Sequence, residues 1–216
     1  MKYIYEDWLT KKVDKDFIEH FNSLLNSGLD AVEKTIDEFK MWPPNERYYI
    51  TWKAAQEASS IDGDFVECGV FKGEEAFYMA KECQTTLHLF DSWLGAENLG
   101  EYDNDYYLAN PFKCSIEDAK STLSEFNNVE FYLGHVPFGF DKVQSISLLS
   151  IDLDLYEPTK ISLEELWPKV VDNGIALIDF HDSVSTGAEK ATREYFANSP
   201  YILKVLPTGK CMVVKK

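Results

Sequence analysis

The sequence has little positive charge, few histidines and no long apolar run. Its 216 residues contain 21 lysines and arginines against 37 aspartates and glutamates, which gives a formal net charge of −16. A protein of this charge repels phosphate backbones, so we expect no nucleic-acid partner. No stretch reaches about 18 consecutive apolar residues, the length that a membrane-spanning helix needs, so we expect no membrane association.

Signals for export and for disulfide bonding are also missing. The N-terminal stretch MKYIYEDWLTKKVDKDF mixes charges early and has no apolar segment of the kind that a secretory signal contains. The four cysteines, Cys68, Cys83, Cys114 and Cys211, are scattered and form no CxxC pair. In a chain of this length, such cysteines are more typical of reduced thiols than of a disulfide framework. We therefore predict a cytoplasmic protein.

From residue 60 onward, the sequence alternates between strand-like and helix-like segments. Short β-rich apolar segments are followed by segments with apolar residues at helical spacing, and Ser115 with Asp118 three positions later marks one helix start. A Thr-Gly turn in the tail, residues 201–216, predicts a hairpin. The expected strands are 64–70, 87–91, 129–134, 147–152 and 175–179, and the expected helices are 74–83, 115–126, 162–170 and 187–198.

This alternation predicts an α/β domain over residues 60–216. The sheet should be mostly parallel, with helices on both faces, and the terminal hairpin should add an antiparallel strand. Residues 1–59 are helical in character and lie outside the alternation. We interpret them as an N-terminal arm or cap that packs on the core, covers the site or mediates dimerisation.

Polar side chains gather where the expected strands end, which is where open α/β sheets bind their ligands. Like charges at one edge of a sheet are costly unless cations or ligand hydroxyls compensate them, so we expect a ligand site there. The residues at these strand ends are Glu67, Asp91, Gly134, His135, Asp152, Asp154, Asp179, His181 and Asp182.

The turn after the first expected strand differs from the turn of a dinucleotide-binding dehydrogenase. Glu67, Gly69 and Gly73 form E-x-G-x-x-x-G rather than G-x-G-x-x-G, and Glu67 would repel a pyrophosphate. Asp91, 24 residues after Glu67, is spaced to hold both hydroxyls of a ribose. S-adenosylmethionine suits both features, because it offers a ribose to Asp91 and an ammonium and a sulfonium to the acidic turn.

Several stretches together carry a resemblance to a known family. They are GDFVECGVFKGEEA, LFDSW, CSIEDAK, VEFYLGHV, IDLDLYEPT and NGIALIDF. The sequence resembles the macrocin O-methyltransferases from about Arg47 to about Phe196, and D-x-D-L-Y-x-x-T is the most specific motif. That family includes enzymes that methylate sugar hydroxyls of macrolide and aminocoumarin antibiotics. The resemblance implies a Rossmann-like class I methyltransferase sheet of seven strands and an S-adenosylmethionine-dependent O-methyltransferase, commonly assisted by Mg²⁺.

The resemblance also implies roles for individual residues. Asp152 and Asp179 match metal ligands of the family, and Asp152 borders the cofactor as well. Phe180 stands where the family normally has a second acid, so His181 or Asp182 would have to complete the ligand set, and a histidine would broaden the choice of ion toward Mn²⁺. The matching cofactor-binding positions are Glu67, Gly69 and Gly73 at the methionine moiety, Asp91 and Ser92 at the ribose, and Gly134 and His135 near the adenine.

For catalysis, a cation at Asp152 and Asp179 would lower the pKa of an acceptor hydroxyl and position its oxygen. Asp154 or His181 would take the proton as general base, although Asp154 could instead cap a helix that starts near Pro158.

Residues 94–112 are long, acidic and aromatic. They are typical either of a lid, whose Tyr102, Tyr106 and Tyr107 would stack on the acceptor, or of a disordered loop.

The sequence therefore predicts methyl transfer from S-adenosylmethionine to a hydroxyl of a sugar or small metabolite, with assistance from a metal. One alternative is the same reaction without a metal, because Phe180 cannot ligate an ion. Another alternative is a catalytically silent nucleoside-binding module. All three of these functions are compatible with a homodimer.

Overall fold

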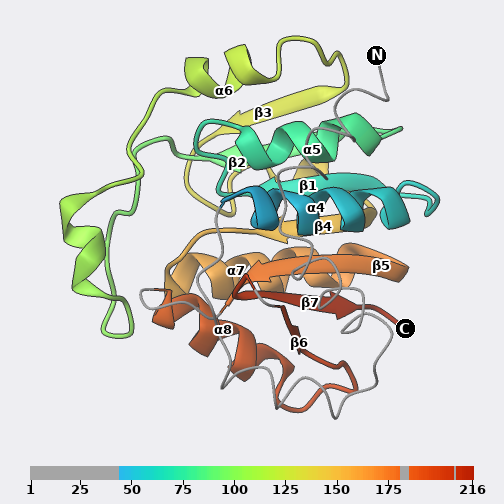
Figure 1. Cartoon of the computed structure of the whole chain (residues 1–216). Coiled ribbons are helices and arrows are strands. Elements are labelled where there is room, and N and C mark those ends of the chain that lie inside the picture. Colours follow the sequence, from blue (N-terminus) through green and yellow to red (C-terminus); the bar gives the residue numbers. More distant parts are fainter. Residues whose placement is uncertain (1–43, 181–184, 207) are drawn as a thin grey trace.

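The computed structural model of the chain describes residues 44–180, 185–206 and 208–216 (Figure 1). A sheet of seven strands forms its centre, in the order β3-β2-β1-β4-β5-β7-β6. The first five strands pair in parallel, and β7 runs antiparallel to both β5 and β6. The strands are β1 (Asp64–Cys68), β2 (Leu87–Asp91), β3 (Val129–Leu133), β4 (Ile146–Ile151), β5 (Val170–Asp179), β6 (Lys204–Val205) and β7 (Lys210–Val214).

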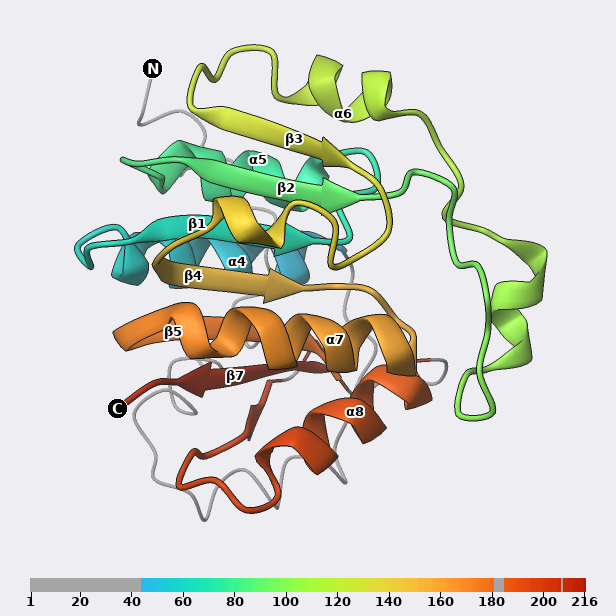
Figure 2. The same cartoon turned by 180° about the vertical axis from the view of Figure 1, so that it is seen from behind.

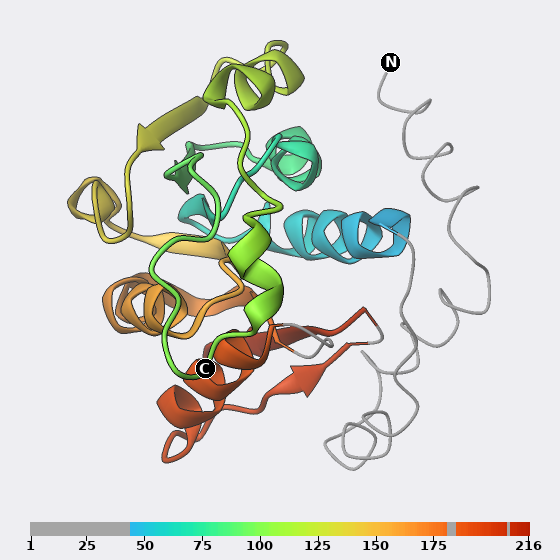
Figure 3. The same ribbon diagram turned by 90° about the vertical axis from the view of Figure 1, so that its left-hand side faces the viewer.

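Helices cover both faces of this sheet, which makes three layers (Figures 2 and 3). One face carries α4, α5 and α6, and the other carries α7 and α8. The bounds are α4 (Pro44–Ala58), α5 (Glu74–Glu82), α6 (Ile116–Thr122), α7 (Tyr156–Leu166) and α8 (Thr186–Phe196). This mostly parallel, Rossmann-like sheet of seven strands with an antiparallel seventh strand is the arrangement that the resemblance implied.

Successive residues of each strand contribute to opposite layers of the core, because side chains alternate across a sheet. In β4, Leu148 packs toward α4 and α5, and Leu149 packs toward α7. Both side chains are fully buried, as expected of a central parallel strand. Burial of one such leucine contributes about 1.5–3 kcal/mol. The same alternation decides which polar residues at the strand ends share a face.

The local signals read from the sequence are largely confirmed. Ser115 caps α6 and forms a capping box with Asp118, and β2 has the predicted bounds. The fifth strand, expected at residues 175–179, begins earlier, at Val170. Asn173 lies inside β5; its backbone takes a left-handed conformation (φ 66°), and its N–H donates to the carbonyl of Lys215 over 2.8 Å.

The segment of residues 92–114 lies along the carboxyl ends of the parallel strands (Figures 1 and 3). It contains a 3₁₀ helix, η1 (Asp105–Ala109). Asp103 Oδ1 accepts the N–H of Tyr156 over 2.7 Å at the start of α7, and Thr186 Oγ1 donates to the carbonyl of Tyr102 over 3.0 Å at the start of α8. The segment is therefore hydrogen-bonded to the first turns of α7 and α8.

The predicted arm, residues 1–59, falls mostly outside the described residues. Its last part forms α4, whose apolar residues pack into the core beside α5. Among the described residues, no helix has both the length and the hydropathy needed to cross a bilayer.

Candidate active site

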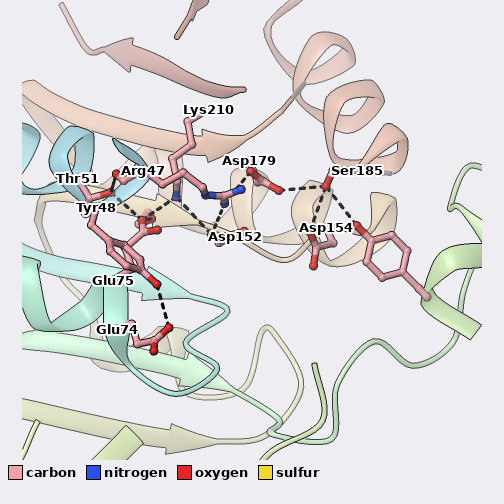
Figure 4. Close-up of polar contacts among 12 residues, drawn as sticks. Arg47, Tyr48, Thr51, Glu74, Glu75, Asp152, Asp154, Asp179, Ser185 and Lys210 are labelled. Carbon is pink, nitrogen blue, oxygen red and sulfur yellow. Dashed lines mark hydrogen bonds and ion pairs between the residues drawn. The ribbon is translucent and has the colours of Figure 1, made fainter. Parts of the chain in front are cut away.

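Three carboxylates meet at the carboxyl ends of β4 and β5 (Figure 4). Asp152, Asp154 and Asp179 each offer an oxygen that lies within 4.8 Å of the oxygens offered by the other two. Because β4 and β5 are neighbours in the sheet, residues that follow them come together although they are distant in sequence. The structure thus groups three of the acidic residues that the sequence pointed to.

Two cationic side chains that sequence reasoning missed lie among these carboxylates (Figure 4). Arg47 Nη2, from the first turn of α4, lies 2.9 Å from Asp152 Oδ2 and 3.1 Å from Asp179 Oδ1. Lys210, at the start of β7, is fully buried, and its Nζ lies 2.6 Å from Glu75 Oε1 and 3.4 Å from Asp152 Oδ2. Arg47 therefore pairs with Asp152 and Asp179, and Lys210 pairs with Glu75 and Asp152.

The alternation of strand side chains explains why these groups meet. Asp152 lies on the same face of the sheet as Leu148, and Asp179 on the same face as Leu177. Lys210 pairs with Asp179 across the β5–β7 ladder. The apolar rows that pack against α4 and α5 are thus continued toward the carboxyl edge by charged residues.

Asp152 and Lys210 each stabilise the ionised form of the other. Burial would by itself raise the pKa of Asp152, but Lys210 and Arg47 more than offset it and hold that pKa below its ordinary value. Burial likewise opposes the charge of Lys210, yet the carboxylates of Glu75 and Asp152 raise its pKa above the ordinary value. Both groups are therefore charged at neutral pH.

Asp154 has a different environment from Asp152. Burial raises its pKa well above the ordinary value, and the neighbouring charges of Asp179 and Asp152 raise it further. The Oγ of Ser185 lies 3.1 Å from Asp154 Oδ1 and 3.0 Å from Asp179 Oδ2. A serine hydroxyl has one proton, so it can donate to only one of these carboxylates at a time.

The backbone at Asp154 is strained. Its φ is 62°, a left-handed value that a residue with a side chain seldom adopts, and the N–H of Leu155 donates back to the carbonyl of Leu153 over 2.6 Å. Asp154 does not cap α7, because the N–H of Tyr156 donates to Asp103 instead. Of the two roles considered for Asp154, capping is therefore excluded.

Glu67 is a buried carboxyl group with an unsatisfied atom. Its exposure is 1%, and Oε2 has no hydrogen-bond partner among the described residues. Burial raises its pKa well above the ordinary value, Glu75 adds to this effect, and Lys210 opposes it. A buried polar atom without a partner is costly unless a ligand satisfies it, so Glu67 fits a cationic or N–H-bearing ligand group.

Gly69 brings two strand ends into close contact. Its φ is +87°, and a Cβ at this position would lie 1.8 Å from the carbonyl oxygen of Asp152. No other residue type could fit there without moving the backbone of Asp152. Gly69 therefore joins the end of β1 to the Asp152 side of the site, in addition to its predicted place beside a cofactor.

Asp91 organises the turn that follows β1. Its Oδ2 accepts the N–H groups of Val70 and Phe71 over 2.7 and 2.9 Å, and its Oδ1 accepts the N–H of Trp93 over 2.7 Å. A carboxylate has about four acceptor positions, so these bonds leave capacity for a ribose hydroxyl. The side chain is pre-positioned by backbone donors before any ligand binds.

The other predicted cofactor positions lie around this turn and beyond β3. Gly73 has a φ of +78° and precedes α5, and the Oγ of Ser92 accepts the N–H of Leu94 over 3.1 Å. Gly134 donates its N–H to the carbonyl of Asp91 over 2.9 Å. His135 is exposed, and its Nε2 lies 3.4 Å from Glu97 Oε2. His181 and Asp182 lie outside the described residues.

Residues 51–202 match the family described as Macrocin-O-methyltransferase (TylF). This match covers most of the chain and includes β1 to β5 with the acidic strand ends. The chain belongs to the macrocin O-methyltransferase family. It is accordingly an S-adenosylmethionine-dependent methyltransferase.

Known proteins resemble this macrocin O-methyltransferase family member in sequence and in fold. Demethyldecarbamoylnovobiocin O-methyltransferase from Streptomyces niveus is 24% identical over 175 residues, which cover 68% of this chain and 67% of that protein. The structure of the O-methyltransferase NovP has a TM-score of 0.69 at 22% identity and covers 79% of both chains. CalS11, a calicheamicin methyltransferase, has a TM-score of 0.64 at 16% identity, with 94% of this chain and 93% of that chain covered. The structural likenesses show the shared fold.

In this macrocin O-methyltransferase family member, Phe180 cannot ligate an ion. Its side chain is 1% exposed and packs in the core layer of α7 and α8, with the guanidinium carbon of Arg193 4.6 Å from the ring centroid.

Tyr107 also departs from the expectation that it stacks on an acceptor. It is 1% exposed, and its hydroxyl lies 3.2 Å from Ser185 Oγ. It therefore connects the segment of residues 92–114 to the carboxylates rather than facing solvent.

Proposed function

We propose that the chain transfers a methyl group from S-adenosylmethionine to a hydroxyl of a sugar or another small metabolite. The observation that carries this proposal is the meeting of Asp152, Asp154 and Asp179 at the strand ends close to Glu67, whose Oε2 has no hydrogen-bond partner in the described part of the chain. Glu67 can bind a cationic cofactor there, and the three aspartates can orient and deprotonate a hydroxyl. The relatives demethyldecarbamoylnovobiocin O-methyltransferase and the calicheamicin methyltransferase CalS11 support an acceptor of this kind.

The residues of the chain fit S-adenosylmethionine. The carboxyl group of Glu67 offers a buried acceptor to an ammonium, and Asp91 offers one to a ribose hydroxyl. Gly69 and Gly73 allow the backbone to approach the methionine moiety, with Asp152 beside it, while Ser92 would border the ribose and Gly134 and His135 the adenine. When bound, this cofactor supplies a methyl group on a sulfonium: the acceptor oxygen forms the new O–C bond, and the sulfur keeps the electron pair of the broken C–S bond.

Asp154 is the proposed general base. Its backbone lies in a strained turn, and its carboxylate lies beside Ser185 and faces the other two carboxylates. The backbone conformation therefore fixes where this carboxylate lies. Its carboxylate would take the proton that the acceptor hydroxyl loses as the oxygen attacks. His181, the other residue predicted for this role, stays a prediction because it lies outside the described residues.

Metal assistance is the open part of the sequence prediction. Asp152, Asp154 and Asp179 bring together carboxylate oxygens, the ligand type that Mg²⁺ prefers, and Asp182 stays a predicted further ligand. The contacts of Arg47 with two of these carboxylates favour the alternative, which is methyl transfer without a metal.

Calorimetry with S-adenosylmethionine, followed by a panel of small sugar-bearing acceptors and a radiolabelled methyl group, tests the proposal. We expect stoichiometric cofactor binding and transfer of label to at least one hydroxyl-bearing acceptor. Binding of cofactor without transfer to any acceptor would instead support a catalytically silent nucleoside-binding module. Failure to bind the cofactor at all would reject both functions.

Other predictions from the sequence accompany this function. We propose a cytoplasmic location, no nucleic-acid or membrane partner, and an N-terminal arm in residues 1–59 that caps the site or supports a homodimer. Size-exclusion chromatography with light scattering would decide between monomer and dimer.

A further inference from the structure

The position that a metal ion would take between Asp152 and Asp179 is filled by a side chain of the protein. One nitrogen of Arg47, Nη2, contacts both carboxylates, at 2.9 Å from Asp152 and 3.1 Å from Asp179. Figure 4 shows the guanidinium reaching between the two acids. A single donor atom that bridges two carboxylates occupies the location where a bridging cation would lie.

Two carboxylate oxygens of this group have further partners. Asp152 Oδ2, the oxygen that Arg47 contacts, also lies 3.4 Å from the ammonium of Lys210, and Asp179 Oδ2 lies 3.0 Å from Ser185 Oγ. The residue after Asp179 is the buried Phe180. Mg²⁺ requires near-octahedral oxygen coordination at about 2.0–2.1 Å. Among the described residues, such an ion would have to displace Arg47 and share Asp152 with an ammonium, so the donor set does not fit Mg²⁺.

Arg47 is held in place by the packing of α4. Thr51, one turn further along this helix, donates to Glu75 Oε1 over 2.9 Å, and that oxygen also accepts from Lys210. The carboxylates that Arg47 contacts are largely removed from solvent, since the side chain of Asp179 is 4% exposed and that of Asp152 is 22% exposed. Such an ion pair is screened much less by salt than a surface pair.

We propose that Arg47 takes the place of a metal ion in this chain, so that methyl transfer is independent of divalent cations. The inference rests on the function proposed above. The guanidinium holds Asp152 and Asp179 together and places a permanent positive charge beside Asp154. A guanidinium has five N–H donors, and Nη2 supplies the contacts with these acids, so its other donors can bind the acceptor oxygen as that oxygen loses its proton to Asp154.

The first test measures metal binding without using activity. Mn²⁺ is titrated into the wild-type protein and the Arg47→Ala variant and followed by electron paramagnetic resonance. We expect the wild type to leave the signal of hydrated Mn²⁺ undiminished, and Arg47→Ala to bind Mn²⁺ at least about tenfold more tightly, because two unpaired carboxylates then face each other. One Mn²⁺ bound per wild-type chain and lost in Asp179→Asn would overturn the proposal.

The second test measures turnover with EDTA and with added Mg²⁺. Wild-type rates should agree within about twofold under the two conditions, whereas Arg47→Ala should lose about 100-fold in kcat, the usual effect of removing one preorganised donor. Lys120→Ala, which removes an exposed cation of α6, serves as the control. A wild-type rate abolished by EDTA and restored by Mg²⁺, or full activity in Arg47→Ala, would contradict the proposal.

Cofactor affinity, measured by calorimetry on the same samples, separates this inference from the proposed function. Failure of the wild type to bind S-adenosylmethionine would reject the proposed function. The Mn²⁺ titration would still decide whether Arg47 excludes a metal.

Discussion

At the scale of single residues, the site combines a strained base with buried ion pairs. The left-handed φ of 62° at Asp154 is a conformation that asparagine adopts as readily as aspartate. Replacement by asparagine therefore removes the carboxylate without adding backbone strain. This residue offers a clean separation between catalysis and folding.

We expect Asp154→Asn to lower kcat by at least about 100-fold, since general-base catalysis commonly contributes 10²–10⁴ in rate. The affinity for S-adenosylmethionine should change by less than about threefold. Steady-state kinetics and calorimetry provide these two numbers. Asp172→Asn, an exposed position at the opposite end of β5, is the matched control. Wild-type kcat in Asp154→Asn would assign the base to another residue.

Lys210 is a second residue whose role can be isolated. Its ammonium is fully buried between Glu75 and Asp152, so Lys210→Met leaves both carboxylates without this cation. Breaking a buried ion pair from one side costs about 3–5 kcal/mol, and we expect a loss of this size in the free energy of unfolding from urea titration. Lys204→Met, on the neighbouring strand β6, should change stability by less than about 1 kcal/mol. A small loss for Lys210→Met would mean that solvent reaches the pair.

At the scale of elements, the segment of residues 92–114 is joined to the helices that frame the site. Leu155, the residue before α7, provides no side-chain cap, and Asp103 supplies the missing acceptor from a distant part of the chain. Tyr107 adds a contact with Ser185 beside Asp154 and Asp179. The segment thus stabilises the first turn of α7 and, through Ser185, borders the carboxylates.

Asp103→Ala should therefore lower the free energy of unfolding by about 1 kcal/mol, the usual effect of a lost helix cap. It should also raise the KM for the acceptor more than that for S-adenosylmethionine, because the segment lies along the strand ends rather than in the turn after β1. Urea titration and steady-state kinetics test the two effects, with the exposed Asp105→Ala as control. Equal changes in both KM values would show that the segment does not act on the acceptor alone.

At the scale of the whole molecule, the net charge of −16 creates a field that favours cations. S-adenosylmethionine has one positive charge more than its demethylated product, S-adenosylhomocysteine. We expect its association rate to fall by up to about tenfold as salt is raised, because salt screens this attraction. Stopped-flow measurements with S-adenosylhomocysteine should show a smaller decrease. An identical salt dependence for the two ligands would exclude long-range attraction of the sulfonium.

Much of this protein was determined by local sequence. The alternation of segments predicts the parallel sheet, the pair Ser115 and Asp118 predicts the start of α6, and the Thr-Gly turn predicts the terminal hairpin. These signals depend on residues a few positions apart, whose effect on the backbone is the same in almost any context. The gathering of the acidic strand ends could also be predicted, because parallel strands bring their carboxyl ends to one edge of the sheet.

Only the tertiary structure decided what compensates those acids. Arg47 is 105 residues from Asp152 and 132 from Asp179, and Lys210 is 135 residues from Glu75. No local pattern distinguishes these two cations from the other basic residues, and their partners are chosen by how α4 and β7 pack on the sheet. The sequence alone therefore specified a group of carboxylates at the strand ends that needed positive charge. The packing of α4 and β7 on the sheet decided that the chain itself supplies this charge.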